Sequence, residues 1–152
     1  MTEVKLNNKF TLHDKYTLLE GRIILSGIQA LVRLLLDQNR ADLIKGLNTG
    51  TLVSGYRGSP VGMLDINLIR NKKLIDQHNI KFIPGVNEDL GATLIYGSQM
   101  AGMVSNVKYD GVMGMWYGKA PGVDRSGDIF RHANFLGAVS YTHLRAHETT
   151  TN

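Results

Sequence analysis

The clearest candidate for acid or base chemistry is Glu88, which directly follows Asn87 in the segment 84–93 (PGVNEDLGAT). Asn is a favoured helix N-cap, so this carboxylate is predicted to stand in the first turn of a helix, beside unsatisfied backbone N–H groups. A carboxylate held at such a strand-to-helix junction can act as a general acid or base. The alternative is structural, because acidic residues in the first turn also stabilise ordinary helices through the helix dipole. Spacing alone leaves both interpretations open.

A second candidate segment is the glycine- and proline-rich turn 55–60 (GYRGSP). Here Gly58 allows the backbone to approach a ligand closely, Ser59 offers a hydroxyl donor and Arg57 offers a guanidinium for a carboxylate. The segment lacks the Gly-Lys-Ser/Thr ending and the full glycine spacing of a phosphate-binding loop. A simple turn is the alternative, since glycine and proline are common turn residues without any function.

The third candidate segment, 116–128 (WYGKAPGVDRSGD), combines two aromatic side chains with a loop rich in glycine, proline and charge. One interpretation makes it a wall of a binding cleft. The other makes it a strand end and a turn that lead into a helix, with Asp124 or Ser126 as the N-cap.

Apolar periodicity predicts a scaffold in which strands, loops and helices alternate. The expected helices cover residues 27–39 (capped by Ser26), 41–45, 63–75, 88–103 and 124–136, and the expected strands cover 50–55, 80–86 and 110–117, the last of them buried. Residues 16–21 fit either a short strand or a turn. This order indicates an α/β fold with a mainly parallel sheet covered by helices. Ligands bind beyond the carboxyl ends of such strands, so the candidate segments are expected to meet at one edge.

Composition excludes several classes of function for this chain. The 152 residues contain no cysteine, so they supply no disulfide, thiolate nucleophile, iron–sulfur cluster or cysteine zinc site. The net charge is +4, but the basic residues are scattered, which argues against nucleic-acid binding. The apolar stretch 28–36 contains Arg33 and is too short to span a membrane. No signal peptide is recognisable, so a cytoplasmic location is expected.

Residues 140–152 differ in character from the rest of the chain and resemble translated sequencing-adapter read-through. We therefore expect residues 1–139 to be the native domain and 140–152 to be a non-native tail. His143 and His147, with Glu148, imitate a metal-binding helix face, but the acidic residue that normally stands between the histidines is missing. A disordered terminus explains these residues better than a metal site does, and no metal ligand is assigned.

Six segments, in this order, resemble the start of the indolepyruvate ferredoxin oxidoreductase family. They are 25–33 (LSGIQALVR), 46–49 (GLNT), 54–62 (SGYRGSPVG), 84–93 (PGVNEDLGAT), 116–119 (WYGK) and 121–135 (PGVDRSGDIFRHANF). The family belongs to the thiamine-diphosphate-dependent 2-oxoacid:ferredoxin oxidoreductases, and the likeness covers about residues 14–138. It implies that the chain is the truncated N-terminal part of a pyrimidine-binding domain in a longer enzyme.

The resemblance also implies roles for particular residues. Glu88 matches the residue that contacts N1′ of the cofactor's aminopyrimidine, which is both a cofactor-binding and a catalytic role. Such a contact favours the imino tautomer, whose nitrogen removes the thiazolium C2 proton. Ser59 stands where related enzymes place a hydroxyl residue in a Tyr-Pro-x-Thr-Pro loop, so Ser59 and Arg57 are assigned to the substrate and Gly58 to the cofactor. The family holds magnesium and diphosphate on a separate domain.

The implied parent enzyme oxidatively decarboxylates an aryl 2-oxo acid to acyl-CoA and passes the electrons through iron–sulfur clusters to ferredoxin. Its expected partners are the 2-oxo acid, coenzyme A, ferredoxin and a diphosphate-binding domain of the same or another chain, within a homo-oligomer. The isolated piece is expected to be inactive. Two alternatives stay open: another thiamine-diphosphate enzyme of the decarboxylase or transketolase type, and a non-catalytic α/β binding module.

Overall fold

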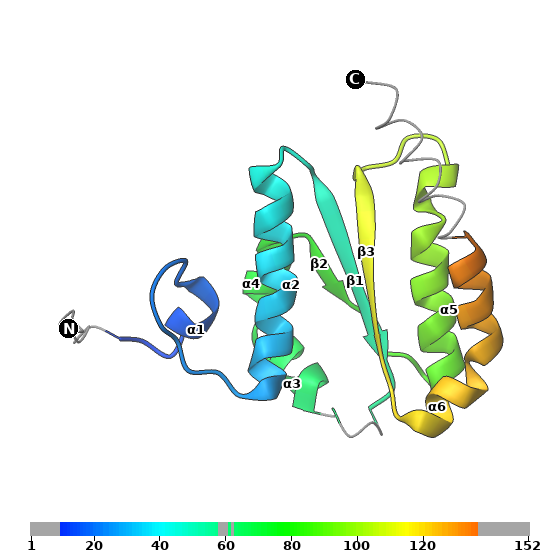
Figure 1. The fold of residues 1–152 in the computed structure, drawn as a ribbon, viewed down its shortest axis with the longest axis horizontal. Helices are drawn as coiled ribbons and strands as arrows, with labels where there is room; N and C mark the ends of the chain where they lie inside the picture. Colours follow the sequence, from blue (N-terminus) through cyan, green and yellow to red (C-terminus); the bar gives the residue numbers. More distant parts are fainter. Residues whose placement is uncertain (1–9, 58–60, 62, 137–152) are drawn as a thin grey trace.

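The computed structural model describes residues 10–57, 61 and 63–136, and this part of the chain is an α/β fold (Figure 1). The strands are β1 (Thr49–Gly55), β2 (Ile80–Phe82) and β3 (Gly111–Tyr117). The helices are α1 (Asp14–Thr17), α2 (Gly27–Ile44), α3 (Met63–Arg70), α4 (Lys72–Gln77), α5 (Glu88–Gln99), the short 3₁₀ helix η1 (Ala101–Met103) and α6 (Ala120–Arg125). Residues 127–136 are also helical.

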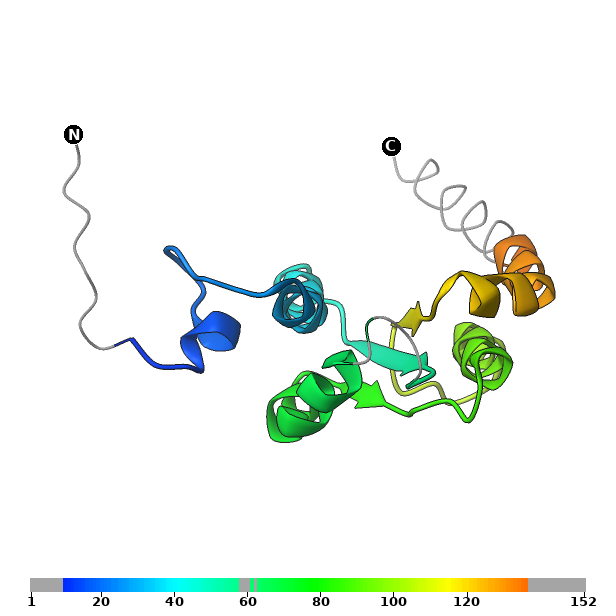
Figure 2. The ribbon, with the colours of Figure 1, turned by 90° about the horizontal axis from the view of Figure 1, so that it is seen from below.

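The strands form one parallel sheet in the order β2-β1-β3. Thr51 of β1 pairs with Ile80 on one side and with Met113 on the other. Helices α2, α3 and α4 lie on one face of the sheet, and α5 and α6 lie on the other (Figure 2). The predicted α/β class, the parallel strands and their helical cover are therefore confirmed.

Strand β1 is central and mostly buried, whereas β3 is not. Only the last residue of β3, Tyr117, is buried, and Gly111 and Gly114 are exposed. The prediction that β3 is a buried strand was wrong. The cause is its position, because within the described residues β3 pairs with β1 alone and forms an edge of the sheet. An apolar run in a sequence does not distinguish an edge strand from a central one.

Helix α2 begins as predicted, but it is longer than predicted. The Ser26 hydroxyl accepts a hydrogen bond from the Gln29 backbone N–H, and the Gln29 side chain accepts one from the Ser26 N–H, so both partners of a capping box are present. The helix then continues past Asn39 to Ile44 without the predicted interruption. It ends before Gly46, which has a φ of +77° that glycine adopts easily. None of the described helices is long and apolar enough to cross a membrane.

Other predicted elements form with changed boundaries. The single helix predicted over 63–75 is divided at Asn71 into α3 and α4. Strand β2 ends at Phe82 rather than at residue 86, two residues before Pro84, whose ring nitrogen has no hydrogen to donate. Helix α5 ends at Gln99, and η1 follows it. The single helix predicted over 124–136 is divided at Ser126 into α6, which begins earlier at Ala120 with Pro121 in its first turn, and the helical residues 127–136.

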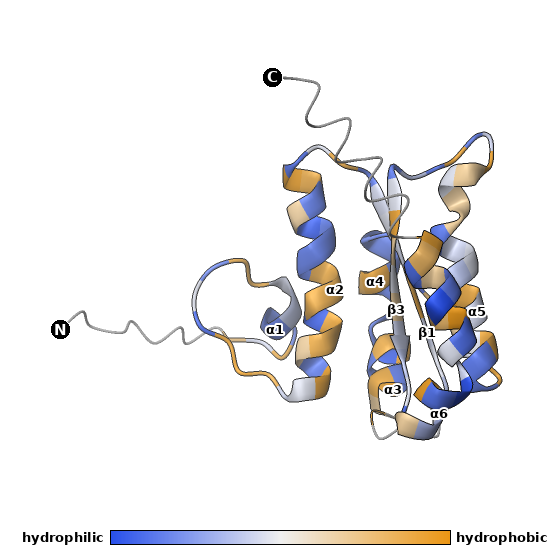
Figure 3. Ribbon diagram, turned by 45° about the vertical axis from the view of Figure 1, so that its right-hand side comes forward, coloured by the Kyte–Doolittle hydropathy of each residue, from blue (hydrophilic) through white to orange (hydrophobic). Residues whose placement is uncertain are grey.

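The main hydrophobic core lies between the sheet and the α2–α3–α4 layer. Its fully buried side chains come from all of these elements and include Val32, Leu35, Leu36, Val53, Leu64, Leu68 and Ile80. Apolar and polar positions alternate around α2 and α5, which is typical of helices that bury one side (Figure 3). The core fixes the orientation of β1 and α3, and so of the chain that leaves the end of β1.

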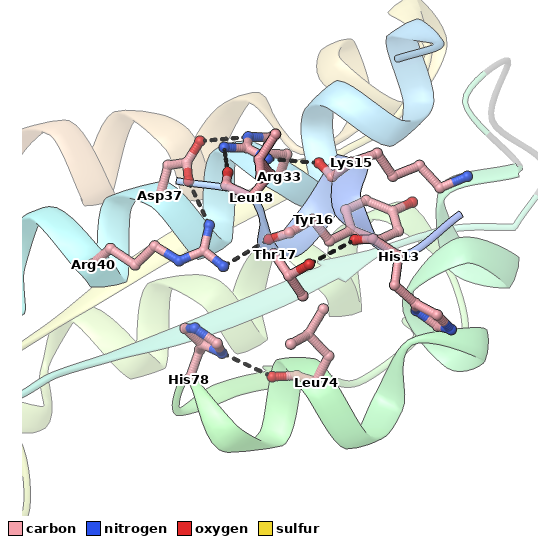
Figure 4. Close-up of polar contacts among 10 residues, drawn as sticks. All are labelled: His13, Lys15, Tyr16, Thr17, Leu18, Arg33, Asp37, Arg40, Leu74 and His78. Atoms are coloured by element: carbon pink, nitrogen blue, oxygen red, sulfur yellow. Dashed lines mark hydrogen bonds and ion pairs between the residues drawn. The ribbon is translucent and has the colours of Figure 1, made fainter. Parts of the chain in front are cut away.

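Helix α1 is attached to this layer by two arginines of α2 (Figure 4). Arg33 donates to the backbone oxygens of Lys15 (2.8 Å) and Leu18 (2.7 Å), and Arg40 donates to the backbone oxygen of Tyr16 (2.6 Å). Asp37 accepts hydrogen bonds from both guanidinium groups. These bonds satisfy carbonyl groups that the short helix leaves unpaired, and the Tyr16 ring is buried in the core. The segment 16–21, which the sequence left unassigned, is therefore the end of a helix followed by a loop.

Candidate functional site

The candidate segments meet at the carboxyl ends of the strands. After β1 the chain turns towards α3 on one face of the sheet, and after β3 it turns towards α6 on the other (Figure 2). This divergence between neighbouring strands marks the usual ligand-binding edge of a parallel α/β sheet. The chain after β2 joins the same edge, since the Gly85 backbone N–H donates to the Gly55 oxygen at 2.9 Å. The expected convergence of the segments after β1, β2 and β3 is seen in their described residues.

Glu88 is the first residue of α5, and its side chain packs against α6. The Asn87 side chain caps the helix by accepting a hydrogen bond from the Leu90 backbone N–H at 2.8 Å. The Glu88 side chain is half-buried, and its carboxylate forms no hydrogen bond or ion pair with the described residues. Its methylene groups lie against Gly122 of α6, where an added Cβ would come within 2.5 Å of Glu88 Cγ. The side chain is thus confined by packing, while its oxygens make no hydrogen bond or ion pair with the described residues and its charge acts on Arg125.

Trp116, near the end of β3, supports Glu88 through the backbone. Its indole Nε1 donates a hydrogen bond to the Glu88 backbone oxygen at 3.2 Å. The indole ring also meets Phe130 edge-on, with ring centroids 4.9 Å apart. Gly118 leaves room for the ring, because a Cβ at that position would collide with it. The third candidate segment therefore packs beside Glu88 and continues into α6.

Asp89 joins α5 to α6 by two side-chain contacts. One carboxylate oxygen of Asp89 pairs with Arg125 Nε at 2.5 Å, and the other accepts a hydrogen bond from the buried Ser126 hydroxyl at 3.2 Å. The hydrogen bond and the charge of Asp89, and to a smaller extent the charge of Glu88, raise the pKa of Arg125 above its usual range. Ser126, which the sequence suggested as a helix cap, directly precedes the helical residues 127–136 and accepts the Phe130 backbone N–H through its own backbone oxygen, while its buried hydroxyl contacts Asp89 of α5.

Tyr117 lies on the opposite face of the sheet from Trp116, within the core cluster that contains Val53 and Leu64. Burial raises the pKa of Tyr117 to about 12, and the negative charge of Asp65 adds to this increase. Its hydroxyl has no hydrogen-bond partner among the described residues. The phenol therefore stays protonated and uncharged at neutral pH.

Arg57 follows β1 and pairs with Asp65 of α3, its Nε lying 3.7 Å from an Asp65 carboxylate oxygen. The Asp65 side chain is buried and the Arg57 side chain is 65% exposed, so the ion pair holds a guanidinium on a largely exposed side chain. This arrangement suits the binding of an anion such as a carboxylate. The structure does not bring Arg57 into contact with Glu88. Gly58 and Ser59 lie outside the described residues, so their roles stay predictions.

Comparisons of the chain with protein-family models, curated proteins and solved structures found no match. The chemistry at this edge must therefore be argued from the residues themselves. Within residues 10–57, 61 and 63–136, no three metal-ligating side chains gather into a group that could hold a metal ion. His143 and His147 lie outside these ranges.

Two cavities within the described residues lie outside the Glu88 and Arg57 surroundings. One of about 590 Å³ is at the amino ends of the strands and is lined by Thr51, Lys81 and Tyr109, among others. Another, of about 310 Å³, lies between α3, α4 and β2, with Leu68, Ile75 and Phe82 in its lining. Neither of these two cavities is lined by Glu88 or Arg57.

The sequence did not reveal Gly122, Asp65 or Asp89 as contributors to the site. Gly122 occurs in an ordinary Pro-Gly pair, and the two acidic residues look like favourable first-turn charges of α3 and α5. The sequence does not show that an acidic residue at the start of a helix will lie next to an Arg or Ser that is distant in the chain. These residues become neighbours only when α6 packs on α5 and when Arg57, after β1, approaches α3.

Proposed function

We propose that the chain is the N-terminal part of a thiamine-diphosphate-dependent 2-oxoacid:ferredoxin oxidoreductase and supplies part of its pyrimidine-binding domain. Two independent features support this proposal. The six family-like segments lie in the same order as in the indolepyruvate ferredoxin oxidoreductases. The described residues of three of them, 54–62, 84–93 and 116–119, lie at the carboxyl ends of the parallel strands, where this fold class binds ligands.

The observation that carries the proposal is the Glu88 carboxylate, which is half-buried, confined by Gly122 and without a hydrogen bond or ion pair to the described residues, although its charge acts on Arg125. A partly buried carboxylate is costly unless it is paired, so its free oxygens fit a ligand that offers an N–H group. The N1′ atom of an aminopyrimidine carries such an N–H when it is protonated or when the ring is in its imino tautomer. The residues present therefore fit the cofactor's pyrimidine end.

Thiamine diphosphate, when bound, supplies the electron sink that permits decarboxylation of a 2-oxo acid. Glu88 contributes by holding a proton at the N1′ atom, in the role of a general acid or base. The Trp116 hydrogen bond fixes the Glu88 backbone during this exchange. Gly58 is proposed to bring the backbone close to the cofactor. Magnesium, diphosphate and the iron–sulfur clusters are proposed to bind to other parts of the parent enzyme.

Arg57 is the residue proposed to bind the substrate. The Arg57 side chain is largely exposed, and Asp65 holds it near the end of β1. A 2-oxo acid carries a carboxylate that a guanidinium binds with two parallel hydrogen bonds. Ser59 is proposed to donate a hydrogen bond to the carbonyl or carboxylate of the same substrate. The products are carbon dioxide, an acyl-CoA and electrons passed one at a time to ferredoxin.

The deciding experiment compares Glu88→Gln with Glu20→Gln in the full-length enzyme that carries this chain at its N-terminus. Glu20 is exposed and lies outside the candidate site, so it controls for loss of a surface carboxylate. We expect Glu88→Gln to lower 2-oxoacid-dependent reduction of a viologen dye about 10²-fold or more, and Glu20→Gln to leave it unchanged. Equal activity in both variants would favour a non-catalytic α/β binding module.

A second measurement separates the proposed reaction from that of a thiamine-diphosphate decarboxylase or transketolase. Reading the uninterrupted gene beyond residue 139 should reveal ferredoxin-type cysteine runs, which ligate iron–sulfur clusters. Absence of such cysteines from the whole enzyme, together with a Glu88→Gln defect, would support one of the other thiamine-diphosphate enzymes.

A further inference from the structure

The contacts around Glu88 assign a role to α6, and this inference rests on the function proposed for Glu88. We infer that Gly122 is a positioning residue, which lets the α6 backbone confine the Glu88 side chain, and that Asp89 holds α6 in this position. Neither residue needs to touch the cofactor or the substrate. Their effect on the reaction passes through the direction of the Glu88 carboxylate.

The first step of the argument is the close approach of Gly122. A Cβ there would come within 2.5 Å of Glu88 Cγ, 3.2 Å of Glu88 Cβ and 3.3 Å of Glu88 Cδ. Three consecutive carbons of one side chain therefore run along the backbone of α6. Any side chain larger than hydrogen would push Glu88 into another rotamer, and a different rotamer moves the carboxylate away from its present place.

The second step is the attachment of α6. This helix has only six residues, and a helix of that length is not stable without tertiary contacts. Asp89 supplies such contacts by pairing with Arg125 Nε and by accepting a hydrogen bond from the Ser126 hydroxyl, which is fully buried. Because Asp89 is the chain neighbour of Glu88, the residue that anchors α6 and the residue that α6 confines share one helical turn.

The third step is the support of the Glu88 backbone from β3. The Trp116 indole donates to the Glu88 backbone oxygen, while its ring packs against Phe130 in the helical residues that follow α6. The backbone of Glu88 is thus held by β3 and its side chain by α6. A variant that disturbs only the second support should leave the fold intact and misplace the carboxylate.

The closing experiment compares Gly122→Ala with Gly127→Ala in the full-length enzyme. Gly127 is also helical and lies five residues further along, and a Cβ there meets nothing within 4 Å, so it is a matched control. We expect Gly122→Ala to lower kcat about 10²-fold, since small misplacements of a catalytic group cost that much, with little change in the KM for the 2-oxo acid. Gly127→Ala should change neither constant.

A second readout does not depend on activity. Trp116 is the single tryptophan of the 152 residues. The tryptophan fluorescence of the isolated 152-residue chain therefore reports on the surroundings of Glu88. We expect Gly122→Ala to shift the Trp116 emission at an unchanged melting temperature, and Gly127→Ala to leave the emission as it is. If Gly122→Ala does not fold, Asp89→Asn carries the test, with Asp124→Asn, an exposed residue of α6, as its control.

The possible outcomes separate the two proposals. A normal kcat in folded Gly122→Ala, alongside an inactive Glu88→Gln, would overturn the positioning role and leave the proposed function standing. A normal kcat in Glu88→Gln would remove the proposed function itself. Equal losses in Asp89→Asn and Asp124→Asn would show a general effect of charge removal and would also overturn the positioning role.

Discussion

The ring of Tyr117 lies across Gly55, the last residue of β1, so closely that a Cβ at Gly55 would come within 2.5 Å of Tyr117 Cδ1. Neighbouring strands end here, and the glycine lets the aromatic ring enter the core between the sheet and α3. The absence of one side chain therefore makes room for another at the edge that carries the candidate site.

The first prediction concerns this contact. Gly55→Ala should overpack the site and lower the free energy of unfolding by about 1–3 kcal/mol, as measured by urea denaturation of the 152-residue chain. Gly97→Ala is the control, because a Cβ at that helical position meets nothing within 4 Å. There alanine should be neutral or slightly stabilising. Equal stability of Gly55→Ala and the unmodified chain would contradict the packing described here.

The second prediction concerns pH. Burial raises the pKa of Tyr117 from 10.0 to about 12 in the folded chain and also raises that of Tyr16. The fold thus favours the protonated phenols, so their contribution to stability is complete below pH 10 and is lost as the pH rises towards 12. Tyr117 alone should lower the free energy of unfolding by about 2 kcal/mol as the pH rises towards 12. Urea denaturation between pH 9 and pH 12 should show that the free energy of unfolding falls less steeply in Tyr117→Phe than in the unmodified chain. Tyr56→Phe, which alters an exposed ring, should keep the full decrease.

The third prediction concerns the attachment of α1. Asp37 orients Arg33 and Arg40 towards the carbonyl oxygens of α1 (Figure 4). Asp37→Asn should therefore loosen α1 and speed limited proteolysis between residues 18 and 26, with a loss of only about 1 kcal/mol in global stability. Asp76→Asn breaks an exposed ion pair with Lys72 and serves as the control. Equal cleavage rates in the two variants would count against an orienting role for Asp37.

The fourth prediction concerns the proposed substrate contact. Arg57→Met should raise the KM for the 2-oxo acid about 10-fold or more, which corresponds to the loss of a charge-assisted hydrogen bond. Its kcat should change less, because Arg57 is proposed to bind the carboxylate rather than move a proton. Arg70→Met, an exposed change at the end of α3, controls for charge. Steady-state kinetics of the full-length enzyme provide the measurement, and an unchanged KM would remove Arg57 from the substrate site.

The fifth prediction concerns the 152-residue chain by itself. It carries Glu88 but no cysteine to hold an iron–sulfur cluster. We expect it to bind thiamine diphosphate weakly and to show no 2-oxoacid-dependent reduction of a viologen dye. Weak binding is measurable as quenching of Trp116 fluorescence. Substantial turnover by the isolated chain would overturn the view that other parts of the enzyme complete the site.

Local signals predicted the parts of this fold that local physics controls. The cap at Ser26, the cap at Asn87 and the alternation of strands with helices were confirmed, because a cap needs only neighbouring residues and a parallel strand needs a crossover helix. The extension of α2 past Asn39 was not predicted. Its last turn contains Asp42, which accepts a hydrogen bond from Thr49 of β1, a contact that depends on the fold.

The candidate site divides in the same way. Glu88 and its place at the edge of the sheet were predictable from the Asn-Glu pair after a strand. The contacts that confine and support it come from Gly122, Asp89 and Trp116, and they join residues that periodicity does not relate. The exposure of β3 was missed for a similar reason, since a strand's neighbours are decided by topology rather than by its own residues.

The sheet order also has a consequence for the order of assembly. β1 is the middle strand, yet it is the first to be synthesised, and its partners are far apart in the chain: Thr51 meets Ile80, whereas Thr49 meets Gly111. The nearer pairing closes the shorter loop and costs less entropy. Until β3 arrives, β1 presents an open row of backbone hydrogen-bonding groups on one side. A ribosome that pauses between β2 and β3 would therefore hold a half-built sheet whose central strand is temporarily an edge.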